Sequence, residues 1–152
     1  MSNSLLRSSI FVLAAVFGAA GVAHAQGDRI LQPPRKELVA VHWPDLANLE
    51  ETVRDQITQA QNSLAAGAKN ADTSDTTLSD AYANLGQLYH AYSLSDPARE
   101  CYLNASTLAP GDFRWIYMLA KLDQQQGRFD DAIKRYRVAI LLQADYIAIH
   151  VN

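Results

Sequence analysis

The sequence predicts an all-α protein that stacks antiparallel pairs of helices, and three observations point to this fold class. A pattern of apolar and small residues that begins at Tyr82 returns 34 residues later. Within each copy, apolar residues recur at steps of three and four, which is the spacing of one helix face. Gly, Pro and Asp separate these stretches and supply turns and helix caps. A self-similarity with this period is typical of stacked helix-turn-helix repeats.

The two copies occupy residues 79–112 and 113–146. The matching positions are Tyr82 and Ile116, Leu85 and Leu119, Gly86 and Ala120, Ser93 and Gly127, Ala98 and Ala132, Tyr102 and Tyr136, and Ala105 and Ala139. This pattern resembles the tetratricopeptide repeat (TPR) family, which implies a TPR-like superhelical stack of antiparallel helix pairs. In the second copy, Asp123 replaces Tyr89 and Ala144 replaces Pro110. We expect the first change to weaken a contact inside the repeat, and the second to let the last helix run on or fray.

The N-terminal residues 1–25 resemble a secretory signal peptide. Arg7 is their only charged residue, an apolar run follows, and Ala23-His24-Ala25 places small residues where a signal peptidase reads. The apolar run is short for a membrane span of ~20 residues, so we expect cleavage after Ala25 rather than a retained anchor. The sequence therefore predicts an exported protein, periplasmic or secreted, with no membrane insertion after signal cleavage.

The charge of the chain disfavours nucleic acid as a partner. The formal net charge is −3, and cleavage after Ala25 would remove one of the 13 basic residues and no acidic one. Because the chain has no basic tail and no excess of Lys and Arg, it lacks the electrostatic pattern that binds phosphate backbones. Cys101 is the only cysteine, so no internal disulfide forms, and we expect its thiol to lie in the core.

Residues 26–44 read as an extended linker, because Pro33, Pro34 and Pro44 interrupt them and they show little periodicity. Trp43 is the one large apolar side chain near the end of this linker. We expect it to pack on the first helix rather than to bind a ligand.

Residues 45–67 form an amphipathic pattern outside the repeats. The apolar positions are Leu46, Leu49, Val53, Ile57, Ala60 and Leu64, and the opposite face is polar. We expect Asp45 to cap this helix and Gly67 to end it. Its predicted role is an N-terminal cap on the first repeat, since terminal repeats need a polar outer surface; a free coiled-coil helix is the alternative.

Residues 68–78 are small and polar and predict a loop, after which Ser79 begins the first helix of repeat one. Gly86 lies within that helix, where the absence of a side chain lets two helices approach closely at a cost of ~1 kcal/mol in helix propensity. Asp96 and Pro97 suit the start of the second helix, as a cap and a first-turn residue. We expect Ala98, a small residue of this second helix, to contact the first helix near Gly86.

Repeat two is predicted to begin with Asp112 as a cap, to turn at Gly127 and to end with a helix over residues 129–142. We expect that last helix to bury Ala132, Ile133, Tyr136, Ala139 and Ile140. The basic residues of the same helix, Lys134, Arg135 and Arg137, read as a solvated face.

A third copy of the pattern begins at Ile147, so residues 147–152 read as the start of a truncated repeat. A stack of repeats normally ends in a helix with a polar outer face, whereas this one ends on apolar residues. We therefore expect the chain to be a fragment of a longer repeat protein, with further repeats on the open C-terminal face. The alternative is a homo-oligomer formed through that face.

The sequence contains no motif that carries chemistry. No His or Cys spacing suits zinc, and the phosphate-binding loop and the nucleophile elbow have no match. The acidic residues fall on helix backs and caps. We therefore predict no catalytic residue, no cofactor, no metal site and no enzymatic activity.

The remaining candidate is a binding surface. In TPR proteins the first helices of successive repeats line a groove that holds a peptide or a partner helix. The resemblance implies a partner-binding groove that contains Asp80, Asn84, Gln87, His90, Arg114, Tyr117, Met118, Lys121, Gln124 and Gln125. Arg114 and Lys121 lie two helical turns apart on one side, where they would meet an acidic peptide.

Together these observations predict an exported scaffold or adaptor that binds a protein or peptide in this groove. The alternative is the interaction arm of a larger exported enzyme or envelope-assembly factor, whose functional domain would lie beyond Asn152.

Overall fold

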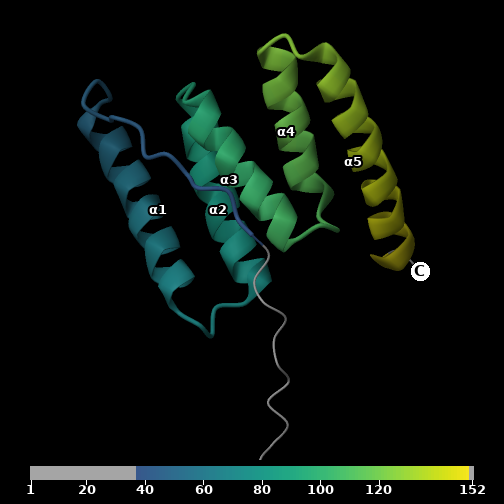
Figure 1. The fold of residues 1–152 in the computed structure, drawn as a ribbon, viewed down its shortest axis with the longest axis horizontal. Coiled ribbons are helices and arrows are strands. Elements are labelled where there is room, and N and C mark those ends of the chain that lie inside the picture. Colours follow the sequence, from purple (N-terminus) through teal and green to yellow (C-terminus); the bar gives the residue numbers. More distant parts are fainter. Residues whose placement is uncertain (1–36, 151–152) are drawn as a thin grey trace, which may run out of the picture. The chain divides into compact units, whose positions relative to one another are not determined.

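The computed structural model describes residues 37–150, and the side chains of residues 37–145. This part of the chain is all-α, as predicted: it contains five helices and no strand (Figure 1). The helices are α1 (Glu51–Lys69), α2 (Asp75–Ala91), α3 (Ser95–Leu108), α4 (Phe113–Gln125) and α5 (Phe129–His150). The predicted signal peptide lies outside the described residues.

The helices lie in a row with α1 at one end and α5 at the other (Figure 1). Consecutive helices pack together, and the closest pairs are α2 with α3 and α4 with α5, which are the two predicted repeats. The main core joins α1 to α4 through these buried side chains: Ile57, Leu64, Leu78, Leu85, Tyr89, Cys101, Tyr102, Leu119 and Leu122. Because Ile57 and Leu64 come from α1, the helix outside the repeats is part of the same core.

The turns inside the two helix pairs are built alike. In the first turn, Ser93 has a φ of 60°, and in the second turn Gly127, 34 residues later, has a φ of 74°. The amide of Leu94 donates to the carbonyl of Tyr89 at 2.8 Å, and the amide of Arg128 donates to the carbonyl of Asp123 at the same distance. The sequence period therefore corresponds to a repeated local geometry, with one left-handed residue between the helices of each pair.

Gly86 lies on α2 at a point where this helix packs tightly against α3. A Cβ atom at this position would lie 3.0 Å from Cys101 Cβ and 3.0 Å from Tyr102 Cε1, which is tighter than ordinary van der Waals contact. The predicted close approach is thus present, although the nearest atoms belong to Cys101 and Tyr102 rather than to Ala98.

The helix outside the repeats differs from its prediction at both ends. Asp45 does not cap α1: its carboxylate accepts a hydrogen bond from the amide of Ala47 at 2.9 Å and stabilises a turn, and the helix begins only at Glu51. Gly67 does not end α1, which continues to Lys69. A glycine ends a helix where the chain turns left-handed, and the chain does not do so at Gly67.

Two further helix starts also differ. Helix α2 begins at Asp75 instead of Ser79, because the Ser74 hydroxyl accepts from the amide of Thr77 at 3.1 Å and caps the helix earlier. Asp96 lies in the first turn of α3 rather than at its cap. In the first turn its negative charge still stabilises the helix, because it lies near the positive end of the helix dipole. The prediction for Asp112 is confirmed: its carboxylate accepts from the amide of Arg114 at 3.0 Å.

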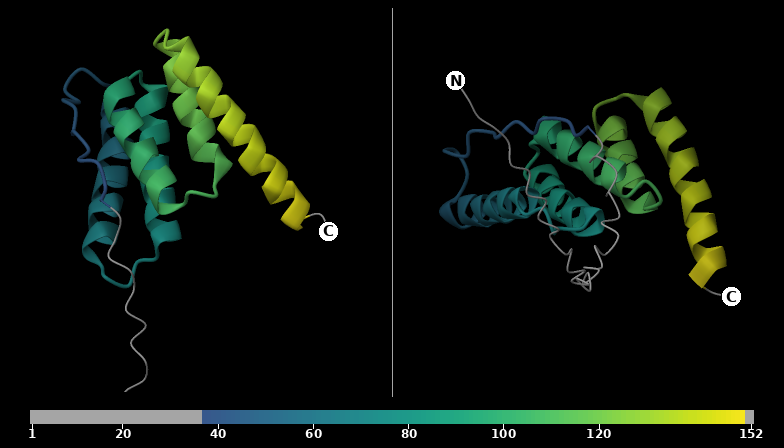
Figure 2. Two further views of the ribbon diagram at one scale, coloured as in Figure 1. Left: turned by 45° about the vertical axis from the view of Figure 1, so that its right-hand side comes forward. Right: turned by 60° about the horizontal axis from the view of Figure 1, so that its bottom comes forward.

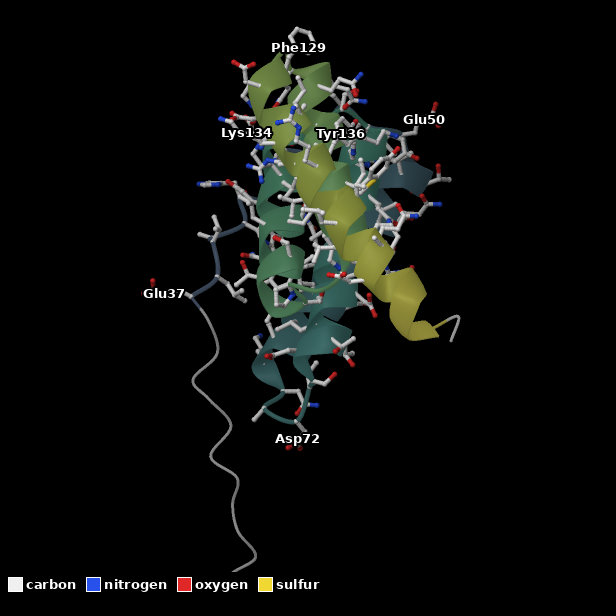
Figure 3. All side chains as sticks on the ribbon, turned by 90° about the vertical axis from the view of Figure 1, so that its right-hand side faces the viewer. Glu37, Glu50, Asp72, Phe129, Lys134 and Tyr136 are labelled. Carbon is white, nitrogen blue, oxygen red and sulfur yellow. The ribbon has the colours of Figure 1, made fainter. Side chains whose placement is uncertain are left out.

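Helix α5 runs on past residue 142, one of the two outcomes expected from Ala144 in place of proline, but it is less covered than predicted. It runs without a break through Ala144 to His150, so no turn separates residues 129–142 from the expected start of a third repeat. Ala132 and Ala139 are buried, but Ile133 and Ile140 are 49% and 65% exposed, contrary to the prediction. Only one side of α5 packs against α4, and no other described helix covers its opposite side (Figure 3).

Candidate functional site

Helices α2 and α4 carry all ten residues of the predicted groove. The structure links two pairs of them across the two helices. Arg114 Nη2 lies 3.6 Å from Asp80 Oδ1, and His90 Nε2 lies 2.7 Å from Gln125 Oε1. Arg114 also binds the Asp112 carboxylate, with Nη2 2.5 Å from Oδ2. Its charge is therefore already paired inside the protein, which weakens the case for Arg114 as a receptor for an acidic peptide.

A polar hollow of about 310 Å³ lies between α1 and α2. Its lining consists of Gln56, Gln59, Ala60, Ser63, Asn84 and Leu88. Asn84 is thus the predicted groove residue that belongs to this hollow. Side-chain amides and a hydroxyl both donate and accept hydrogen bonds, so this surface suits polar groups and remains well hydrated without a ligand.

An apolar hollow of about 380 Å³ lies between α4 and α5. Its lining consists of Phe113, Tyr117, Tyr136, Ala139, Ile140 and Gln143, and we call it the aromatic groove. Tyr117 is the predicted groove residue found here. Tyr136 was predicted to be buried in the last helix, and Phe113 was not among the predicted groove residues. The sequence signal for both is an aromatic residue three or four positions from another lining residue: Phe113 lies four before Tyr117, and Tyr136 lies three before Ala139.

The two tyrosines hold each other in place in the aromatic groove. Their ring centroids lie 5.6 Å apart at an interplanar angle of 58°, which is a favourable tilted arrangement. The Tyr136 hydroxyl donates to Gln124 Oε1 at 2.8 Å. Gln124, another of the predicted groove residues, thus helps to hold the Tyr136 ring in place. Desolvation, and to a smaller extent the nearby Tyr117, raises the pKa of Tyr136 from its ordinary value. The groove is therefore preformed, with Tyr117 45% exposed at its rim.

The other predicted residues do not join either hollow. Gln87 is exposed on α2, and Met118 and Lys121 are half-buried on α4. The structure therefore divides the single predicted groove into a polar hollow, an aromatic groove and a seam of paired polar side chains between α2 and α4.

Asp123 is the most buried charge in the described part of the chain, with 1% of its side chain exposed. Oδ1 accepts from Arg99 Nη2 at 2.6 Å and from Arg128 Nε at 2.9 Å, while Oδ2 accepts from Arg135 Nε at 2.7 Å. We call these four residues the Asp123 cluster. The expectation that Asp123 weakens its repeat is wrong, because the carboxylate ties α3, α4 and α5 together.

Residues 37–44, the described part of the predicted linker, are held against α3 and are not free (Figure 1). Residues 26–36 of that prediction lie outside the described residues. The Asn104 side chain accepts from the amide of Val39 at 2.7 Å and donates to the carbonyl of the same residue at 2.8 Å. Glu100 accepts from the amide of His42 at 2.7 Å and lies 2.5 Å from its Nδ1. The expectation for Trp43 is wrong, because its side chain is more than half exposed.

The single thiol is placed for packing. Cys101 is fully buried, and desolvation raises the pKa of its thiol to about 12, with a smaller contribution from Glu100. A thiol that stays protonated is a poor nucleophile and a poor metal ligand. Among the described side chains, no group of three His, Cys, Asp or Glu residues is placed to hold a metal ion.

Comparisons with protein-family models, with curated proteins and with solved structures each found no match. Within residues 37–150, no helix is both long and apolar enough to span a membrane.

Proposed function

We propose that this protein is an exported, TPR-like scaffold or adaptor that binds an apolar side chain of a protein partner in the aromatic groove. The observation that carries this proposal is the groove itself: a preformed apolar hollow with two tyrosines at its wall whose rings pack in a tilted arrangement. Exposed tyrosines that a second contact holds in place lose little entropy on binding, and such residues are frequent hot spots of protein interfaces.

The TPR-like assignment rests on the repeated turn geometry and on the pairing of α2 with α3 and α4 with α5. The chemistry of the lining favours binding over catalysis. Aromatic and aliphatic side chains dominate it, and Gln143 is its one residue with a polar side chain other than the tyrosine hydroxyls. A partner helix or extended segment that inserts one apolar residue suits such a surface.

Photo-crosslinking tests this proposal. A photoreactive phenylalanine derivative replaces Tyr117, and the same probe replaces Thr58, an exposed residue on α1, as the matched control. We expect the Tyr117 probe to form a discrete adduct with a protein of the envelope fraction, and the Thr58 probe to form none. The same adduct from both positions, or adducts from neither, would contradict the proposal.

Export is a separate part of the proposal and has its own test. The motivation is the pattern of Arg7, the apolar run and Ala23-His24-Ala25. N-terminal sequencing of the protein recovered from the envelope fraction should begin at Gln26. A chain that begins at Met1 and remains with the cytosol would refute export.

A further inference from the structure

The Asp123 cluster holds more positive charge than its one carboxylate neutralises. Each of its three arginines places a nitrogen between 2.6 and 2.9 Å from a carboxylate oxygen, so the four residues carry a net charge of +2. Helix α4, which carries Asp123, lies between α3 and α5 (Figure 2), and this position lets one carboxylate collect Arg99 from α3 and Arg135 from α5. The chain as a whole is acidic, with a formal net charge of −3. The cluster is therefore a local positive site that attracts anions within a Debye length of roughly 10 Å.

The same arginines keep hydrogen-bond donors that the described residues do not use. Arg135 donates to Asp123 through Nε, and its Nη1 and Nη2 groups donate to no acceptor among residues 37–145. Arg99 donates through Nη2 alone, to Asp123 and Gln126. The side chains of Arg99 and Arg135 are only 20% and 32% exposed, so the fold fixes their positions. The parallel N–H groups of a guanidinium match two oxygens of a carboxylate or a phosphate.

Arg135 also lines a hollow of about 280 Å³ between α4 and α5. We call it the cationic hollow, and its lining consists of Ile116, Asp131, Lys134, Arg135 and Val138. Lys134 and Tyr136 project from opposite sides of α5 (Figure 3), so this hollow is separate from the aromatic groove. One acid faces two cations in the lining: Lys134 Nζ lies 3.5 Å from Asp131 Oδ1, and Arg135 adds a second positive charge.

The remaining wall of the cationic hollow is aliphatic. Ile116 is half-buried and Val138 is 46% exposed. Walls of low polarity strengthen the attraction between the cations and a bound anion. They also suit the carbon chain of an organic ligand, and the volume of the hollow suits a small molecule. A cluster with two uncompensated positive charges favours a dianion over a singly charged carboxylate.

We propose that the cationic hollow binds a small phosphate monoester. Arg135 and Lys134 contact the phosphate oxygens, and the carbon chain of the ligand lies on Val138 and Ile116. Asp123 is a positioning residue, because it holds Arg135 in place and collects the other two arginines whose charges favour a dianion. This inference goes beyond the proposed protein-binding function and does not rest on it, since the two hollows lie on different sides of α5.

Titration of the isotope-labelled chain with butyl phosphate, followed by the backbone amide NMR signals of residues 134–138, tests the site. At pH 7.5 and low salt we expect a saturable shift with a dissociation constant of about 1 mM. Inorganic phosphate, which lacks the carbon chain, and pentanoate, which has the chain but one charge, should each bind at least about fivefold more weakly. The absence of a saturable shift would overturn the proposal, and so would equal binding of either comparison ligand.

Two variants with matched controls locate the site. Val138→Asp places a carboxylate in the cationic hollow and should weaken the binding of butyl phosphate at least about tenfold. Its control is Ile133→Asp, which makes the same change on the opposite side of α5 at a position of similar exposure, 49% against 46%. Lys134→Ala should weaken binding about threefold, whereas Lys69→Ala on α1 should leave it unchanged. Equal effects of Val138→Asp and Ile133→Asp would show that the phosphate responds only to net charge, and would overturn the proposal.

Discussion

The substitution Asp123→Ala removes the carboxylate on which three arginines converge. We expect it to be the most destabilising single polar-to-alanine change in the described part of the chain. After the substitution, Arg99, Arg128 and Arg135 lose their shared acceptor and repel one another across the junction of α3, α4 and α5.

The size of the effect follows from the exposure of the three partners. Each charge-assisted hydrogen bond contributes roughly 1.5–3 kcal/mol, which gives an upper sum of about 4.5–9 kcal/mol. The arginine side chains are 20%, 40% and 32% exposed, so water can solvate much of their charge once the carboxylate is gone. We therefore expect a loss of about 3 kcal/mol in the free energy of unfolding, and a fall in Tm of about 10 °C.

Urea denaturation and differential scanning calorimetry measure this loss. The matched control is Asp131→Ala, which removes an exposed carboxylate 3.5 Å from Lys134 Nζ and should change the free energy of unfolding by less than about 0.5 kcal/mol. If Asp123→Ala and Asp131→Ala lower the Tm equally, the Asp123 cluster does not stabilise the fold and the reasoning fails.

Three other predictions concern the interior and the segment before α1. Gly86→Ala should lower the free energy of unfolding by about 1–2 kcal/mol, because overpacking against Cys101 outweighs the gain in helix propensity; Gly111→Ala, whose Cβ would meet nothing within 4 Å, is the control, and equal urea midpoints would refute the close contact. Asn104→Ala should speed hydrogen exchange at the Val39 amide at least about tenfold, and unchanged exchange would show that the segment is held by other contacts. Burial raises the folded-state pKa of the Cys101 thiol from 9.0 to about 12. The stabilisation that comes from burying the protonated thiol is therefore fully present below pH 9 and is lost as the pH rises toward 12. A disulfide reagent at pH 8 should modify this thiol only in urea, and rapid modification of the folded protein would contradict its burial.

The sequence predicted the helical fold because its strongest signals are local and periodic. Ile57, Leu85 and Leu119 are buried as their spacing indicated, and the turn at Gly127 carries the positive φ that glycine tolerates. The same periodicity misplaced the start of α1, since Leu46 and Leu49 fit a helix but pack on the core from a turn instead.

The features that the sequence did not predict depend on residues far apart in the chain. Nothing in the spacing of Arg99, Asp123 and Arg135 indicates that one carboxylate would collect arginines from neighbouring helices. The contact between Val39 and Asn104 joins residues 65 positions apart, and its extended segment has no periodic signal. Burial on α5 was overestimated because periodicity gives the apolar face of a helix but not the presence of a neighbour to cover it.

The candidate site was predicted in part. Tyr117 and Asn84 were assigned to a groove by resemblance, and each lines a hollow. They were predicted to lie on one surface, whereas the Arg114–Asp80 ion pair and the His90–Gln125 hydrogen bond between α2 and α4 separate them. Phe113 and Tyr136 escaped the prediction because an aromatic residue on an apolar helix face is more often part of the core than of a binding site.

The most direct test of the proposed function is a calorimetric titration of the partner segment that the Tyr117 probe captures. Tyr117→Ala should weaken its binding by about 2 kcal/mol, a change in Kd of roughly 30-fold. Asn84→Ala, in the polar hollow, should change the Kd by less than about threefold. If Asn84→Ala weakens binding as much as Tyr117→Ala, or if neither does, the aromatic groove is not the binding site.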